Sequence, residues 1–196
     1  MRLLAAVGGI AVVVVIAAGV YLFGGFYDVS AAVDDPDLMN WTLLRIREAS
    51  INRRADAPPP IKLDDPATIR QGAIEFAEHG CANCHGAPGV KWAKFSEGLN
   101  PGPPDLKESM SDEAPAHVFW VVSNGIKMTA MPSFSKAGVS DEDIWEIVAF
   151  IKNLPNISEA DYNAWTAPPP SVATPPRTQD TQSPAQNTTP PARSNK

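Results

Sequence analysis

Five residues decide the fold of this chain: Cys81-Ala82-Asn83-Cys84-His85. The spacing of the cysteines places both sulfurs on one side of a helical turn, and the histidine follows directly. No other cysteine occurs among the 196 residues, which excludes a framework of several disulfides. The chemistry of the pair is therefore local to this turn.

Three kinds of site use closely spaced cysteines, and the composition separates them. A structural zinc ion needs two more soft ligands, and only His79 and His117 remain to supply them. A thioredoxin-like dithiol needs a βαβ pattern, which is missing. Covalent haem attachment needs two thiols that add to the vinyl groups of one porphyrin and a histidine for its iron. We therefore predict one covalently attached haem c, held by Cys81 and Cys84 and ligated through its iron by His85.

The sixth coordination position of the iron can be filled by the protein, left to water or left open for a gas. A thioether is the usual ligand for electron transfer at a fairly high potential. Met128 and Met131 compete for this role in one turn-rich segment. Because Met131 precedes Pro132, its backbone is held extended and its side chain can project from a rigid loop. We predict Met131 as the second iron ligand and interpret Met128 as a core residue. His117, inside a helix, is disfavoured.

The histidine ligand needs a further hydrogen bond. One ring nitrogen of His85 is reserved for iron, and the other N–H should donate to a carbonyl, which fixes the ring. The predicted source of that carbonyl is the loop Asn100-Pro101-Gly102-Pro103-Pro104. Simple stiffening of the loop by its prolines is the alternative.

Three helices are predicted around the motif. The first covers residues 67–79, after an acidic N-cap and a proline. The second starts after Ser111, with two acidic residues in its first turn, and runs to residues 124–125. The third follows a cap at Ser140 and ends at residues 153–155. Because no alternating run long enough for a strand lies between them, the predicted fold class is all-α.

A long apolar run opens the chain. Residues 3–27 contain no charge, and 25 helical residues span about 37 Å, enough for a bilayer. A cleaved signal peptide is the alternative, but its apolar region usually has only about 7–15 residues. Arg2 before the run and Asp28 after it favour a cytoplasmic N-terminus. Haem attachment of this kind is completed outside the cytoplasm in bacteria. We therefore expect a single pass through the bacterial inner membrane and a periplasmic haem domain.

The remaining segments are a spacer and a tail. Residues 38–54 predict a helix with several arginines and a moderate apolar face, either a solvated spacer or a collar on anionic headgroups or a membrane partner. A proline run then stiffens the chain. After residue 165 almost no large apolar residue remains, which predicts disorder. The predicted organisation is a transmembrane anchor (1–27), a helical spacer and Pro-rich linker (28–61), a haem domain (62–165) and a disordered Pro-rich tail (166–196).

The charge of the chain bears on its partners. A formal net charge of −6 disfavours nucleic acid, because a phosphate backbone demands a concentrated basic surface. Lysines do flank the segments expected to contact the haem, and they form a local positive rim suited to a protein partner: Lys91, Lys94, Lys127 and Lys136.

Taken together, these motifs resemble class I cytochromes c, and more narrowly their membrane-anchored, proteobacterial, monohaem members. The likeness covers roughly residues 27–162 and rests on residues 81–89, 99–105, 119–120, 125–132 and 144–150. It implies Met131, rather than Met128, as the distal ligand, although alanine at position 130 departs slightly from an expected glycine. It also implies that the first and last helices of the domain cross at Gly72, Phe76, Ile147 and Phe150.

A function follows from the predicted ligands. With both axial positions occupied by protein, the iron has no open site for a small-molecule substrate. We therefore expect a non-enzymatic carrier of single electrons between protein redox partners, tethered to the membrane of a respiratory chain. Two alternatives remain: a fixed cytochrome subunit of a membrane-attached dehydrogenase or oxidase, and an enzyme or gas sensor in which Met131 is displaced.

Overall fold

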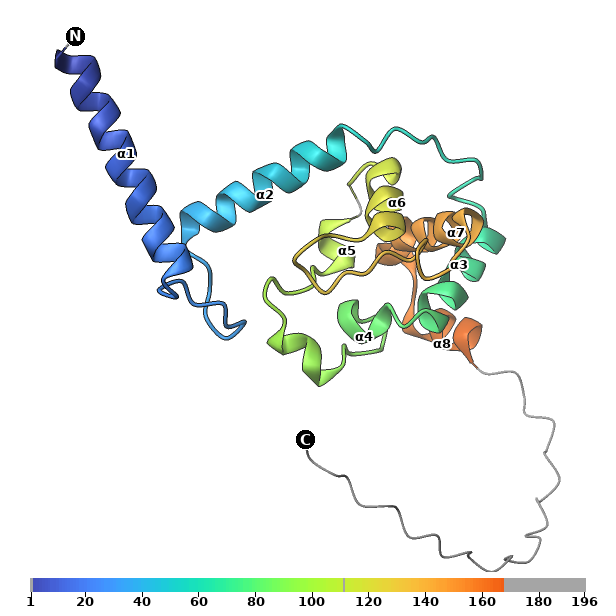
Figure 1. Cartoon of the computed structure of the whole chain (residues 1–196). Coiled ribbons are helices and arrows are strands. Elements are labelled where there is room, and N and C mark those ends of the chain that lie inside the picture. Colours follow the sequence, from blue (N-terminus) through green and yellow to red (C-terminus); the bar gives the residue numbers. More distant parts are fainter. Residues whose placement is uncertain (1, 111, 168–196) are drawn as a thin grey trace, which may run out of the picture. The chain divides into compact units, whose positions relative to one another are not determined.

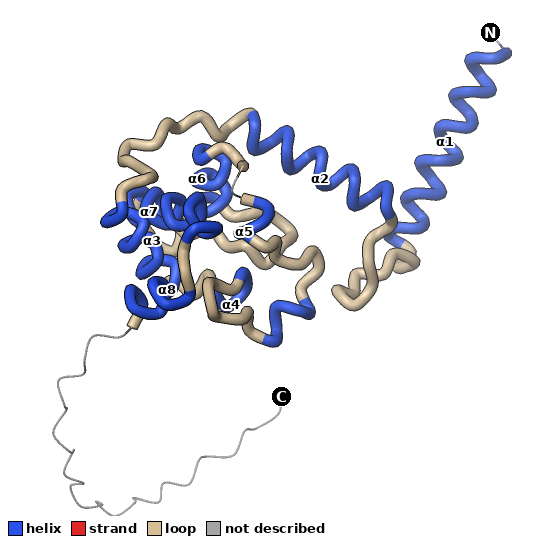
Figure 2. Tube along the Cα trace, turned by 180° about the vertical axis from the view of Figure 1, so that it is seen from behind, coloured by secondary structure: helices blue, strands red, loops and turns tan. Residues whose placement is uncertain are grey.

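All regular structure in the described part of the chain is helical. The computed structural model describes residues 2–110 and 112–167 (Figure 1). Figure 2 shows helices joined by loops, with no strand among these residues. The predicted all-α class is confirmed. The helices are α1 (Arg2–Phe23), α2 (Asp37–Asn52), α3 (Pro66–Glu78), α4 (Ala82–His85), α5 (Leu106–Ser109), α6 (Pro115–Asn124), α7 (Asp141–Asn153) and α8 (Glu159–Thr166), with 3-10 turns at Lys94–Gly98 and Leu154–Asn156.

The first helix, α1, is apolar after Arg2, and none of its 22 residues is buried. Its length of about 33 Å at 1.5 Å per residue suffices to cross a membrane. The helix is followed by a turn in which Gly25 adopts a φ of +78°. This helix is consistent with the predicted single-pass anchor. From residue 168 on, the predicted disordered tail lies outside the described residues.

Capping residues set the ends of the two core helices, α3 and α7. Asp65 caps α3 by accepting a hydrogen bond from the N–H of Thr68 at 3.0 Å. At α7, the Ser140 hydroxyl accepts from the N–H of Asp143 at 3.1 Å, and the Asp143 carboxylate accepts in return from the N–H of Ser140 at 3.4 Å. Both helices agree with the predictions to within a residue at the N-terminal end.

The core lies where α3 crosses α7. Gly72 presses against the backbone of Glu146, so that no room exists there for a Cβ atom. One turn further along α3, the rings of Phe76 and Phe150 lie 5.1 Å apart, and both are fully buried. The crossing implied by the resemblance to class I cytochromes c is therefore confirmed.

The predicted start of the second helix was wrong. α6 begins at Pro115, rather than directly after Ser111, which itself lies outside the described residues. Proline fits the first position of a helix because its φ is preset and its missing N–H has no partner to lose there. It also forces Ala114 into extended backbone, with ψ of 133°. Glu113 therefore precedes the helix and contacts His117 instead.

Candidate haem site

The cysteine motif forms a tight helical turn directly after α3. Gly80 reverses the chain with a φ of +72°, and the N–H of Cys81 then donates to the carbonyl of Phe76 at 3.1 Å. The N–H of His85 donates to the carbonyl of Cys81 at 3.0 Å, which closes α4. Both cysteines are unpaired and half-buried. The predicted helical turn is thus present, with both thiols available.

Burial raises the pKa of the Cys81 thiol to about 12. A redox dithiol needs a thiol whose pKa is lowered, because the thiolate is the reactive species. The environment of Cys81 has the opposite effect. This disfavours the thioredoxin-like interpretation of the motif on physical grounds, independently of the missing βαβ pattern.

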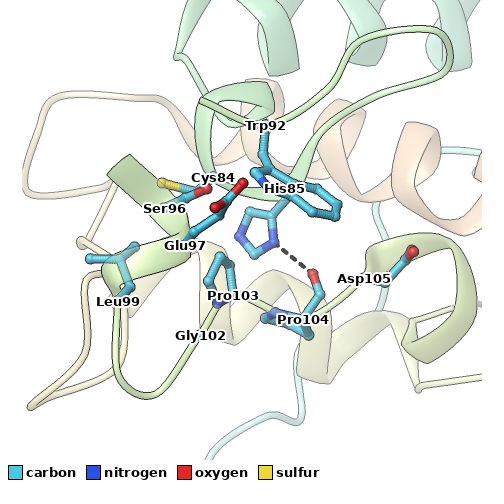
Figure 3. Close-up of a pocket in the computed structure, with 10 residues that line it drawn as sticks. All are labelled: Cys84, His85, Trp92, Ser96, Glu97, Leu99, Gly102, Pro103, Pro104 and Asp105. Carbon is cyan, nitrogen blue, oxygen red and sulfur yellow. Dashed lines mark hydrogen bonds between the residues drawn. The ribbon is translucent and has the colours of Figure 1, made fainter. Parts of the chain in front are cut away.

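His85 is oriented by the proline-rich loop, as predicted. Its Nδ1 lies 3.0 Å from the carbonyl oxygen of Pro104 (Figure 3), and because a carbonyl only accepts, Nδ1 carries the proton. Burial also lowers the pKa of His85, which favours the neutral imidazole. A neutral ring with Nδ1–H engaged presents the Nε2 lone pair, the form in which histidine binds metals. Trp92 lies beside the ring (Figure 3).

One large cavity adjoins this turn. Its volume is about 800 Å³, within the range of cofactor sites. Its walls bring together Cys81, Cys84, His85 and Met131, the four side chains singled out from the sequence. The rest of the lining is mostly apolar and comes from α3, α5, α6, α7 and the loops, including Phe76, Leu99, Leu106, Val118, Val122, Phe134, Ile147 and Ile151. In size, apolar character and donor set, these residues fit a covalently attached haem.

The two methionines occupy different environments. Met131 is partly buried against the core and lines the cavity. Its loop is held by the Thr129 hydroxyl, which accepts from the Met131 N–H at 3.1 Å, and by its own carbonyl, which accepts from the Ile126 N–H at 3.2 Å. Met128 is 83% exposed, so its interpretation as a core residue was wrong. Its φ of +62° places it in a turn that directs it to solvent.

Both remaining histidines also line the cavity, each beside a carboxylate. His117 Nδ1 lies 2.6 Å from Glu113 Oε1, and His79 Nε2 lies 3.3 Å from Glu75 Oε2. Sequence reasoning missed a further wall, because four residues of α2 also line the cavity: Arg47, Glu48, Ile51 and Asn52. No periodicity or motif in α2 indicates this contact.

An all-helical domain in which α3 and α7 cross beside a Cys-X-X-Cys-His turn, with the histidine hydrogen-bonded to a loop carbonyl, is the arrangement typical of c-type cytochromes. Residues 67–151 match the family model described as cytochrome C oxidase, cbb3-type, subunit III. Residues 67–151 therefore form a cytochrome c domain, which supports an electron-transfer role and implies covalently bound haem c and protein redox partners. No curated protein and no solved structure matches the chain. The match includes α3, α6 and most of α7, and excludes α1 and α2.

Proposed function

We propose that the chain is a membrane-anchored carrier of single electrons that binds one haem c through Cys81, Cys84, His85 and Met131. The observation that carries this proposal is the shared cavity, because all four side chains line it. When bound, haem c supplies an iron that alternates between Fe(II) and Fe(III). The chain supplies the two thioether attachments, the two axial ligands and an apolar enclosure.

Each axial ligand is held by the backbone around it. Pro104 fixes the plane of the His85 ring and strengthens Nε2 as an electron donor through the hydrogen bond to Nδ1. The loop that carries Met131 is held by hydrogen bonds to both the N–H and the carbonyl of this residue. If His85 and Met131 both bind the iron, no coordination position would remain for a substrate, which favours electron transfer over catalysis.

The N-terminal helix supports the proposed location. α1 is apolar enough to span a membrane, and Arg2 at its start favours a cytoplasmic N-terminus. The proposed haem domain, residues 62–165, then lies in the periplasm of a bacterium. A tether keeps this domain near membrane-bound redox complexes and raises its effective concentration there. This supports a role as a relay in a respiratory chain.

A fixed subunit of an oxidase or dehydrogenase is the second candidate. It is favoured by the description of the matching family, which names subunit III of a cbb3-type cytochrome C oxidase. Purification of the full chain in a mild detergent separates the two candidates. A stoichiometric complex that survives size exclusion would establish the subunit, whereas a single haem-loaded chain that is reduced and reoxidised by separate membrane fractions would establish the carrier.

The proposed ligand is tested by two methionine variants of the full chain. Met131→Ala should abolish the long-wavelength charge-transfer band of methionine-ligated ferric haem, whereas Met128→Ala, the matched control in the same loop, should retain it. Carbon monoxide should bind reduced Met131→Ala and not the reduced wild type at neutral pH. Binding to the wild type would overturn the closed site and favour the enzyme or gas sensor.

The proposed partners can be identified by crosslinking in intact membranes through the exposed lysines of the predicted positive rim, among them Lys91, Lys127 and Lys136. Products that contain a quinol-oxidising or oxygen-reducing complex are the expected outcome. Crosslinked products without any redox protein would overturn the respiratory assignment while leaving haem attachment intact.

A further inference from the structure

The spacer helix α2 belongs to the wall of the cavity. Arg47, Glu48, Ile51 and Asn52 line the same cavity as His85 and Met131, and α2 packs against α6. A separate contact joins the spacer to the proline-rich loop at 100–104, because the side chain of Asn100 donates to the carbonyl of Val33 at 3.1 Å. The spacer therefore contacts the haem domain, although no residue of α2 is buried.

The charges around the cavity are unevenly distributed. Its lining contains two carboxylates, Glu48 and Glu113, and among the described residues that line it Arg47 is the one lysine or arginine. Both carboxylates already have partners: Glu48 lies 3.4 Å from Arg45, and Glu113 lies 2.6 Å from His117. Neither a hydrogen bond nor an ion pair joins Arg47 to another residue in the described part of the chain.

Haem c brings two propionate groups, which are ionised at neutral pH and need cationic or hydrogen-bonding partners wherever they leave water. A guanidinium suits a carboxylate better than any other side chain, because its planar fork donates two parallel hydrogen bonds and its charge persists at every accessible pH. The apolar walls contributed by Val118, Val122 and Ile147 cannot serve this purpose. Arg47 is the lining residue whose charge and hydrogen-bond donors would suit a propionate.

We propose that α2 completes the haem crevice and that Arg47 binds the haem propionates, so that the spacer between anchor and domain is part of the cofactor site. This proposal rests on the proposed attachment of haem at Cys81 and Cys84. It assigns a binding residue outside the stretch matched by the family model, which begins at residue 67. A cation at the propionates also offsets negative charge near the iron and thereby favours Fe(II).

The test uses the full-length, haem-loaded protein in detergent and compares Arg47→Gln with Arg53→Gln. Arg53 is the matched control, because it is also exposed, follows the same helix, carries the same charge and does not line the cavity. We expect Arg47→Gln to lower the midpoint potential at unchanged haem content, Arg47→Lys to restore part of the loss, and Arg53→Gln to leave the potential near the wild-type value. Equal shifts in Arg47→Gln and Arg53→Gln, or none in either, would overturn the proposal.

A second measurement needs no variant. Phenylglyoxal modifies free guanidinium groups, and peptide mass spectrometry of the modified wild-type protein gives the rate at each arginine. Arg47 should react several-fold more slowly than Arg53 if a propionate covers it, and equal rates would contradict the proposal. A chain that carries no haem would overturn the proposed function itself, whereas attached haem with a fully reactive Arg47 would overturn only the role of α2.

Discussion

Replacing Gly72 by alanine tests the crossing that supports the cavity. A Cβ atom at this position would meet the carbonyl carbon and oxygen of Glu146 at less than the 3.0 Å that real Cβ contacts respect, so α3 and α7 would have to separate by about 1 Å. Such a gap forfeits about a quarter to a half of the dispersion energy of each facing contact, including the Phe76–Phe150 pair. The obstructing atoms belong to the backbone of the buried helix α7, so they cannot rotate away as a side chain would.

Two opposing effects set the magnitude for Gly72→Ala. Alanine improves helix propensity by about 1 kcal/mol, whereas overpacking costs about 1–3 kcal/mol and more where backbone must move. We expect a net loss of about 2 kcal/mol, equivalent to a fall in Tm of about 8–16 °C for a domain of this size. Urea unfolding of the haem-loaded protein, followed by Soret absorbance and far-UV circular dichroism, measures the loss.

Gly98→Ala is the control, because a Cβ atom there meets nothing within 4 Å. It should change the free energy of unfolding by less than about 0.5 kcal/mol. A loss below about 1 kcal/mol for Gly72→Ala would refute the reasoning, since it would mean that the two helices separate without disturbing the core.

Two further predictions concern α7. Ser140→Ala removes the capping box and should lower the free energy of unfolding by about 1 kcal/mol in urea titrations, and an unchanged midpoint would mean that the cap is redundant. The pKa of Glu146 is raised by burial and then by the neighbouring Glu75, so the folded state holds this proton more tightly than the unfolded state. Stability should therefore fall as pH rises through the raised pKa. Glu146→Gln should be more stable than the wild type at neutral pH, and the difference should vanish in acid below the ordinary glutamate pKa; a difference independent of pH would contradict the assignment.

Much of the core could be predicted from the sequence because its signals are local. Asp65 and Ser140 mark helix starts through their own hydrogen bonds, and the apolar spacing of α7 repeats within one helix. The loop that supplies the carbonyl partner of His85 was also predicted, because its prolines make it a rigid segment close to the motif in sequence. In each case neighbours in sequence determine the structure.

Features set by distant contacts could not be predicted. The contribution of α2 to the cavity could not be predicted, because Arg47 and Met131 line the same cavity although they are more than eighty positions apart in sequence. No periodic pattern in the sequence indicates such a distant contact. The exposure of Met128 depends on a positive φ that methionine rarely adopts. The short helix α5 has four residues, too few for a period to be recognised, and α8 is only weakly amphipathic.

Two walls of the cavity, α3 and α6, pack against the buried helix α7, and this has a consequence for the rate of electron transfer. α7 contacts α3 at Gly72, stacks Trp145 on Phe119 of α6 at 4.3 Å, and reaches the carbonyl of Met110 through Lys152 at 3.1 Å. A close-packed interior resists displacement. Such packing would limit how far the dipoles of these two walls turn when the charge of a bound cofactor changes by one. We expect a small reorganisation energy, so that the same rigidity that stabilises the domain also lowers the barrier to oxidation and reduction.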